Sequence, residues 1–425
     1  DSTMDQQPSN DIGTKANSDK FFTTPLVIIF ITIFIDLIGF GMVIPILPYY
    51  AETAPFNATP FEIGMLFSVY SWMQFFFSPV LGRLSDRYGR RPILFMSLMG
   101  SAVGYFVLGM AGTLAMVFIG RILGGITGGS ISTAQAYIAD VTSKENRAKG
   151  MGLFGAAFGL GFILGPAIAG ILSKYGVQVP FYFAAALSLI NAIALLFILP
   201  ESVKFGAVPE VKEKRNRFLD IIESFGEPKF GLINLIYFLL VTAFSIMTYA
   251  FVLFTMYRFQ FNAEQNGYLF AYVGIVSIIG QGFLFGRLVK QVGESRLVAI
   301  GCVIMAVSLI TFPFIGPQFG GLAFLLIATS LLSFGNAMAS PSLTSLASKI
   351  SAENEQGRAL GILQSGASLA RAIGPTIGGV LLNNSLNRID NSTVIRTFGT
   401  ASAIMFVAFI AALYFSRFMR SQPTV

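Results

Sequence analysis

The sequence contains no histidine and only one cysteine, Cys302, among its 425 residues. The lack of histidine excludes a histidine-based catalytic triad, a histidine proton relay and most zinc sites. One cysteine cannot form an internal disulfide, and a single thiol in an apolar run is not a metal site. We therefore expect no bound metal.

Charged residues are also scarce. They make up 12% of the chain, whereas a soluble domain typically has about 25%, so an ordinary soluble protein is excluded. No Gly-Lys-Ser or Gly-Lys-Thr occurs, which removes the phosphate-binding loop of an ATP-driven pump. Gly150, Gly152 and Gly155 match a dinucleotide-binding pattern, but they open an apolar run, and close helix packing explains them better.

Long apolar runs fill the chain instead, and 54% of its residues are hydrophobic. A bilayer core of about 30 Å needs about 20 apolar residues in a helix. Twelve runs meet that length: 25–50, 62–82, 92–112, 114–139, 148–172, 179–199, 229–257, 265–286, 296–316, 319–348, 358–382 and 393–417. The runs predict a chain organised as a tail (1–24), a six-helix bundle (25–199), a linker (200–228), a second six-helix bundle (229–417) and a second tail (418–425).

The distribution of Lys and Arg predicts the orientation. With the amino terminus inside, 22 of the 28 basic residues fall in cytoplasmic segments, 4 in external loops and 2, Arg121 and Arg371, within spans. Both tails are therefore expected in the cytoplasm. Topology accounts for the net charge of +7, and no nucleic acid partner is needed.

An internal repeat relates the two halves of the chain. Residues 150–172 align with 359–381 at a constant offset, which pairs Gly165-Pro166 with Gly374-Pro375. The second run and its loop likewise align with the eighth. We predict an all-α membrane protein of twelve transmembrane helices, in two pseudo-symmetric six-helix bundles around a central cavity. Such repeats are typical of transporters that open the cavity alternately to each side.

Asp36 is the only acidic residue well inside a predicted span. A buried carboxylate is costly unless it is paired or protonated, which makes it a candidate proton carrier, with a structural ion pair as the alternative. Counting helical rise places Asp36 about 16 Å from the inner surface, Arg121 about 10 Å below the outer surface and Arg371 about 20 Å from the inner surface. These depths predict one charged layer, in which Arg121 holds Asp36 ionised.

Four more polar residues are candidate walls of the cavity. Gln364 and Ser368 share a helix face with Arg371, which is suited to an anionic or zwitterionic group. Arg371 alternatively caps carbonyls freed by Gly374-Pro375. Asn336 and Tyr249 are placed in the cavity wall, with plain packing as their alternative.

The fifth run carries small residues at helical spacing. Gly161, Gly165 and Ala169 form one stripe, Gly170 lies beside it, and Pro166 removes a backbone donor. We expect the stripe to pack against a neighbouring helix at the interface that moves.

Five motifs then occur in order: DLIGFGMVIPILP (36–48), GRLSDRYGRRP (82–92), RILGGITGG (121–129), AYIADVT (136–142) and GLGFILGPAIAG (159–170). They resemble the major facilitator superfamily, within it the twelve-span drug/proton antiporters, and most closely the tetracycline/proton antiporter branch. Tetracycline antiporters also have acidic residues in spans three and nine, which residues 93–110 and 297–314 lack. We therefore do not expect tetracycline itself as the substrate.

The resemblance implies a transporter, not an enzyme, which exports a small amphipathic or drug-like molecule in exchange for protons. It implies no cofactor, a monomer, and a bacterial inner membrane. A proton-coupled nutrient importer and a flippase for lipids or amphipathic metabolites remain the alternatives on the same fold.

The resemblance also suggests a role for the loop at 82–92. In the family, the aspartate that matches Asp86 caps a helix of the opposite half in one conformation. We carry this role over to Asp86, facing the start of the eleventh span near Arg358, and expect Arg90 to reach Asp140. The predicted latch comprises Gly82, Arg83, Asp86, Arg87, Gly89, Arg90 and Asp140.

Overall fold

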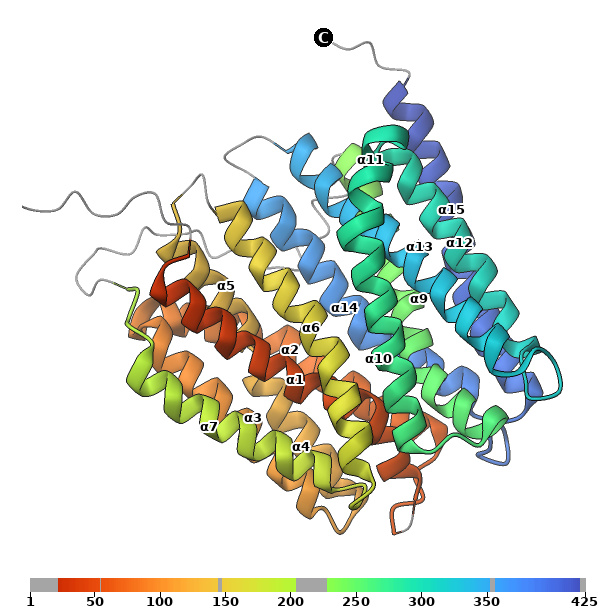
Figure 1. Ribbon diagram of the computed structural model, residues 1–425, viewed down its shortest axis with the longest axis horizontal. Coiled ribbons are helices and arrows are strands. Elements are labelled where there is room, and N and C mark those ends of the chain that lie inside the picture. The colour runs from red at the N-terminus through yellow and green to blue at the C-terminus, as the bar shows by residue number, and fades with distance from the viewer. Residues whose placement is uncertain (1–21, 54, 144–146, 204–227, 352–355, 421–425) are drawn as a thin grey trace, which may run out of the picture.

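The computed structural model describes residues 22–53, 55–143, 147–203, 228–351 and 356–420. In these residues the chain is almost entirely helical (Figure 1). The first half forms α1 (Thr24–Glu52), α2 (Pro60–Tyr88), α3 (Arg90–Met110), α4 (Leu114–Thr127), α5 (Ser130–Val141), α6 (Arg147–Ser173) and α7 (Val179–Ile198). The second half forms α9 (Pro228–Phe259), α10 (Ala263–Ile279), α11 (Gly286–Val292), α12 (Glu294–Thr311), α13 (Gly321–Ile350), α14 (Gln356–Leu382) and α15 (Asn391–Arg420).

Two of the twelve crossings contain two α-helices each. The fourth is α4 and α5, interrupted at Gly128 and Gly129. The eighth is α10 and α11, joined by a π-helical turn over Gly280–Phe285. Within the described residues, eleven crossings are long and apolar enough to span a membrane. The remaining crossing, α14, is the eleventh along the chain. It has 27 residues and falls below that apolarity because it carries the polar residues predicted for the cavity.

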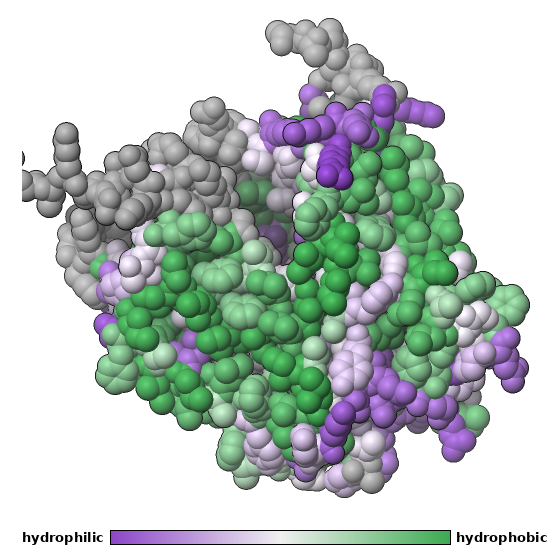
Figure 2. Space-filling model, in the orientation of Figure 1, coloured by the Kyte–Doolittle hydropathy of each residue, from purple (hydrophilic) through white to green (hydrophobic). Residues whose placement is uncertain are grey.

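The surface of the two halves confirms the membrane prediction. Apolar side chains cover the flanks of the molecule in a broad band (Figure 2), with Ile190, Phe197 and Phe406 among the exposed ones. Soluble monomers rarely expose continuous apolar patches of more than a few hundred Å². The twelve-helix membrane fold predicted from the sequence is thus confirmed. Most of the predicted tails and most of the predicted linker lie outside the described residues.

The repeat produces two equivalent crossings between the halves, which we call the glycine crossings. Where α6 meets α10, a Cβ atom on Gly267 would lie 2.7 Å from the Cα of Gly170 and 2.6 Å from the carbonyl oxygen of Pro166. Where α14 meets α2, the repeat-related contact forms: a Cβ atom on Gly64 would lie 2.5 Å from the carbonyl oxygen of Pro375. Glycine is required at both crossings because the backbones touch.

The halves meet at one end and separate at the other. We call the end at which α15 finishes, at the top of Figure 1, the termini face, and the other end the opposite face. Both glycine crossings lie toward the opposite face, near the loops that follow α1 and α9. At the termini face, Figure 2 shows a hollow between the halves. The described conformation is therefore closed at the opposite face and open at the termini face.

Candidate substrate and proton site

Asp36 lies near the middle of α1 and is half-buried. Its carboxylate accepts a hydrogen bond of 2.8 Å from the hydroxyl of Ser130. Asp36 and Ser130 also line a small cavity between α1, α3 and α5, whose volume of about 10 Å³ is close to the space needed for the centre of one water molecule.

The interruption of the fourth crossing explains this contact. Gly128 and Gly129 end α4, so that Ser130 becomes the first residue of α5. The carboxylate of Asp36 therefore lies at the amino-terminal end of a helix, where the helix dipole favours negative charge. Sequence reasoning missed Ser130, although the Gly-Gly-Ser order within a span was a visible signal for a helix break.

Arg121 does not pair with Asp36 in this conformation, which corrects the predicted pairing. Its Nε donates a hydrogen bond of 3.0 Å to the carbonyl oxygen of Leu66, and its guanidinium lies 4.3 Å from the ring centre of Tyr70. The predicted contact fails because each side chain has another partner. Asp36 contacts Ser130, which lies nine residues beyond Arg121 in its crossing, about 13 Å along a helix.

Tyr70 interacts electrostatically with all three of the charged residues predicted for the central layer. Its hydroxyl lies within electrostatic range of Asp36, Arg121 and Arg371. Gly125 packs against the Tyr70 backbone, since a Cβ atom there would lie 2.5 Å from the Tyr70 carbonyl oxygen. The glycines of the fourth crossing thus leave room for an aromatic residue of α2. The sequence of neither segment alone indicates this contact between the two helices.

Arg371 has no carboxylate partner among the described residues. Its Nη2 donates a hydrogen bond of 3.0 Å to the hydroxyl of Ser368, which in turn bonds to the carbonyl oxygen of Gln364. Gln364 is exposed and Arg371 is half-buried, although α14 is surrounded by α2, α9, α13 and α15. Polar exposure on an enclosed helix is compatible with the predicted place of this face in the cavity wall, which stays a prediction.

The two remaining wall candidates differ from each other. Asn336 is partly exposed in α13, which is compatible with its predicted place. Tyr249 is only 1% exposed, and its hydroxyl donates a hydrogen bond to the carbonyl oxygen of Pro60, at the start of α2 in the other half. In this conformation Tyr249 is not a wall residue, because it is part of the closed opposite face.

Further contacts close that face, and together with the contact of Tyr249 we call them the outer clasp. The Tyr49 hydroxyl donates to the carbonyl oxygen of Phe261 at 2.6 Å and also contacts Asn266. Lys174 pairs with Glu264 at 2.8 Å, and this carboxylate raises the pKa of Lys174. Every one of these contacts joins one half to the other, so all must break if the opposite face opens.

The predicted helix-packing motif of α6 contacts two neighbours. Gly161 and Gly165 pack on α1, since a Cβ atom on Gly165 would lie 2.7 Å from the carbonyl oxygen of Ile38. Pro166 and Gly170 form one of the glycine crossings with α10 in the other half. The motif thus reaches both a helix of its own half and the interface between halves.

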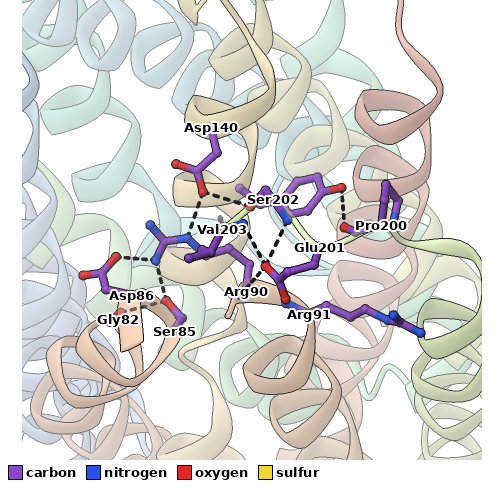
Figure 3. A network of polar contacts seen from close by, with 11 residues as sticks. Gly82, Ser85, Asp86, Arg90, Arg91, Asp140, Pro200, Glu201, Ser202 and Val203 are labelled. Carbon is purple, nitrogen blue, oxygen red and sulfur yellow. Dashed lines mark hydrogen bonds and ion pairs between the residues drawn. The ribbon is translucent and has the colours of Figure 1, made fainter. Parts of the chain in front are cut away.

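At the termini face, Arg90 is the centre of a network of polar contacts around the loop at 82–92 (Figure 3). Its guanidinium pairs with Asp86 at 2.6 Å and with Asp140 at 3.0 Å, and it also bonds to the hydroxyl of Ser85 at 2.6 Å. The expected contact between Arg90 and Asp140 is present. Asp86 is 55% exposed and points to Arg90 in its own half. Its predicted contact across the halves involves Arg358, whose side chain lies outside the described residues.

Glu201 is a member of this network that sequence reasoning missed. Its carboxylate accepts hydrogen bonds from the backbone N–H groups of Arg90 at 2.9 Å and Arg91 at 3.1 Å, which caps the start of α3. Gly89 has a φ of 101°, and a Cβ atom there would lie 2.5 Å from the Glu201 carboxylate. Both conditions require glycine at 89.

Three other latch residues lie apart from the network's ion pairs. Gly82 has open space around it, although its carbonyl accepts a hydrogen bond from Ser85. Arg83 and Arg87 are exposed, and the Arg87 guanidinium lies over the ring of Tyr88. The latch role therefore stays a prediction for a conformation closed at the termini face.

Two repeated helical halves, a closed face, an open face and ionisable groups in the layer between them define a class: multi-pass membrane transporters that work by alternating access. The chain belongs to the Major Facilitator Superfamily, whose sequence profile matches residues 29–348 and 282–424. The superfamily resemblance seen in the motifs is confirmed.

Similar proteins include several drug-resistance proteins. The chain is 31% identical to the tetracycline resistance protein, class H, of Pasteurella multocida, covering 92% of this chain and 95% of that protein. It is 29% identical to multidrug resistance protein 2 of Bacillus subtilis, covering 86% and 90%.

Solved structures show the same fold. A bacterial homologue of the human lysosomal transporter Spinster, in an inward-facing and unoccupied conformation, has a TM-score of 0.75 at 15% identity and covers 96% of this chain and 100% of its own. The human organic anion transporter MFSD10 has a TM-score of 0.68 at 24% identity, covering 92% and 99%.

Proposed function

We propose that this protein is a proton-coupled exporter of small amphipathic molecules, in which Asp36 carries the proton. The observation behind the proposal is a single carboxyl group deep in a membrane span, bonded to a hydroxyl at the start of a broken helix and not neutralised by a nearby arginine. The drug-resistance function named for the relatives supports export.

The proposed orientation follows the distribution of basic residues. The termini face is the cytoplasmic side of a bacterial inner membrane, and the opposite face is external. The described conformation is then open to the cytoplasm, which is the state in which an exporter accepts its cargo. No cofactor is needed, because a proton gradient drives the cycle.

Charge in the central layer suggests the substrate class. Arg121 is held by Leu66 and Tyr70, whereas the Arg371 guanidinium donates its hydrogen bond to the neutral hydroxyl of Ser368 and has no ion pair among the described residues. Ionised Asp36 leaves one net positive charge in the layer and protonated Asp36 leaves two. An amphipathic anion or zwitterion would bind at Arg371. Binding there would compete with protonation of Asp36 less directly than binding at Asp36 itself.

The proposal is tested by proton movement in liposomes that contain the purified protein. A pH gradient is imposed and lipophilic anions, zwitterions and cations are added separately. We expect members of one charge class to collapse the gradient, with protons and compound moving in opposite directions. Movement in the same direction would identify an importer, and compound-dependent lipid scrambling without proton flux would identify a flippase. Either result would overturn the proposal.

Ser130 provides a second, milder test. In Ser130→Ala, the carboxylate of Asp36 loses its hydroxyl donor, and a hydrogen bond to a charged group contributes about 1.5–3 kcal/mol. We expect exchange to slow by up to about 10- to 100-fold, with recovery in Ser130→Thr, which keeps the hydroxyl. Equal rates in wild type and Ser130→Ala would show that this contact does not matter for coupling. Ser132→Ala is the matched control, since the Ser132 hydroxyl bonds only to the carbonyl of Gly129.

A further inference from the structure

A groove runs along the seam between α12 and α15 at the termini face, away from the interface between the halves. It has a volume of about 320 Å³, within the range of small-molecule sites. Six of its lining residues carry the argument: Arg296, Ile300, Val303, Phe409, Ser416 and Arg417. Neither α12 nor α15 contributes a residue to the candidate proton site.

The groove is polar at one end and apolar along its length. α12 begins at this face, so Arg296 lies near its start and Val303 about 10 Å deeper. α15 ends at the same face, so Arg417 lies near its finish and Phe409 about 12 Å deeper. Both arginines therefore lie at one end, at the level expected for lipid headgroups, above an apolar channel.

The charge at that end is not balanced by a carboxylate of the described residues. Arg296 and Arg417 are both exposed, and no ion pair is found for either within the described part of the chain. The nearest acidic residue in sequence, Glu294, is already bound by Lys349 at 2.8 Å and Ser345 at 2.6 Å. Two guanidinium groups at the mouth of a groove thus favour an anionic group.

We propose that this groove binds an anionic phospholipid of the leaflet at the termini face. The phosphate lies between Arg296 and Arg417, where guanidinium groups form strong charge-assisted hydrogen bonds to phosphate oxygens. One acyl chain lies against Ile300, Val303 and Phe409. Basic pockets between membrane helices are known to bind lipid headgroups in this way, and the apolar channel beneath the charges distinguishes a lipid from free phosphate.

Native mass spectrometry of the full protein, purified in detergent, measures the retained lipid directly. Dioleoyl phosphatidylglycerol and dioleoyl phosphatidylcholine are offered in equal amounts, so that only the headgroup differs. We expect wild type to retain phosphatidylglycerol preferentially, and Arg296→Gln with Arg417→Gln to reduce this preference roughly tenfold or more. Arg287→Gln with Lys290→Gln removes the same charge from exposed positions of α11, outside the groove, and should retain the preference.

A second variant tests the apolar channel without changing charge. Val303→Trp fills the groove and should reduce retention of phosphatidylglycerol, while elution volume and thermal stability in phosphatidylcholine show that the fold is intact. The proposal is overturned if both double variants lose equal amounts of lipid, since the effect would then be general surface charge. It is also overturned if Val303→Trp retains the lipid in full, or if millimolar inorganic phosphate at constant ionic strength displaces it.

Discussion

Asp36→Asn is expected to abolish compound-driven proton movement, reducing it to the rate in liposomes without protein. Asparagine has nearly the shape of aspartate and still contacts Ser130, but it cannot take up or release a proton. Asp36 is the only carboxyl group in the middle of any described span, so no nearby group replaces it. The measurement is the collapse of an imposed pH gradient on addition of the active compound.

Two comparisons make this result specific. Asp36→Asn should still bind the compound and exchange it for the same compound on the other side, because such exchange needs no proton. Glu62→Gln is the matched control: this carboxylate only caps the start of α2, through Thr59, and its loss should leave proton movement unchanged. Proton movement that persists in Asp36→Asn would mean that Asp36 is structural and that coupling occurs elsewhere.

The sequence predicted those features of the fold that depend on one segment at a time. Runs of about 20 apolar residues predicted the crossings, and the alignment of 150–172 with 359–381 predicted two equivalent halves. The repeat went further than expected, since the same positions, Pro166 with Gly170 and Pro375 with Gly379, form the two glycine crossings. The constant offset between the two segments was sufficient to predict equivalent halves, because repeated segments occupy equivalent places in the two halves.

The pairings between side chains could not be predicted in the same way. Depth counted from the ends of spans placed Asp36 beside Arg121, whereas the break at Gly128 and Gly129 brings Ser130 to the carboxylate. Tyr249 seemed a cavity residue from its position in the seventh span, but its direction around the helix places it in the outer clasp. The rotation of each helix about its axis and the positions of helix breaks decide which side chains touch within a layer. Neither can be read from hydropathy.

The latch network contains one contact that the sequence predicted and one that it did not. The expected contact between Arg90 and Asp140 joins two motifs that each carry an obvious charge. Glu201 follows the last residues of the sixth span and caps α3, which starts 111 positions earlier in the chain. Nothing in the sequence around Glu201 marks it as a cap, because its partners are backbone N–H groups and these occur at every helix start.

Gly267→Ala is expected to have the largest effect on conformation. A Cβ atom there would lie within 2.6–3.0 Å of the α6 backbone at Pro166 and Gly170, and backbone atoms cannot turn aside. Overpacking of this kind costs about 1–3 kcal/mol, which shifts a two-state population by about 5- to 150-fold. The cost arises between the halves and not within one, so it should favour opening of the opposite face over unfolding.

Cysteine labelling measures this shift. In a Cys302→Ser background, Ser68→Cys places a thiol in the closed interface, where the Ser68 hydroxyl lies 2.7 Å from that of Thr376. A membrane-impermeant maleimide added outside should label this thiol slowly, and faster by the same 5- to 150-fold when Gly267→Ala is present. Gly112→Ala is the control, since nothing lies within 4 Å of a Cβ atom there.

The repeat gives this prediction a second, independent arm. Gly64→Ala alters the equivalent crossing between α2 and α14, so it should raise labelling in the same direction, even though it lies on the other side of the interface. If only one of the two variants acts, the crossings are not equivalent in the moving protein. If neither acts, closure of the opposite face depends on the outer clasp alone, and the glycines serve packing without controlling which face is open.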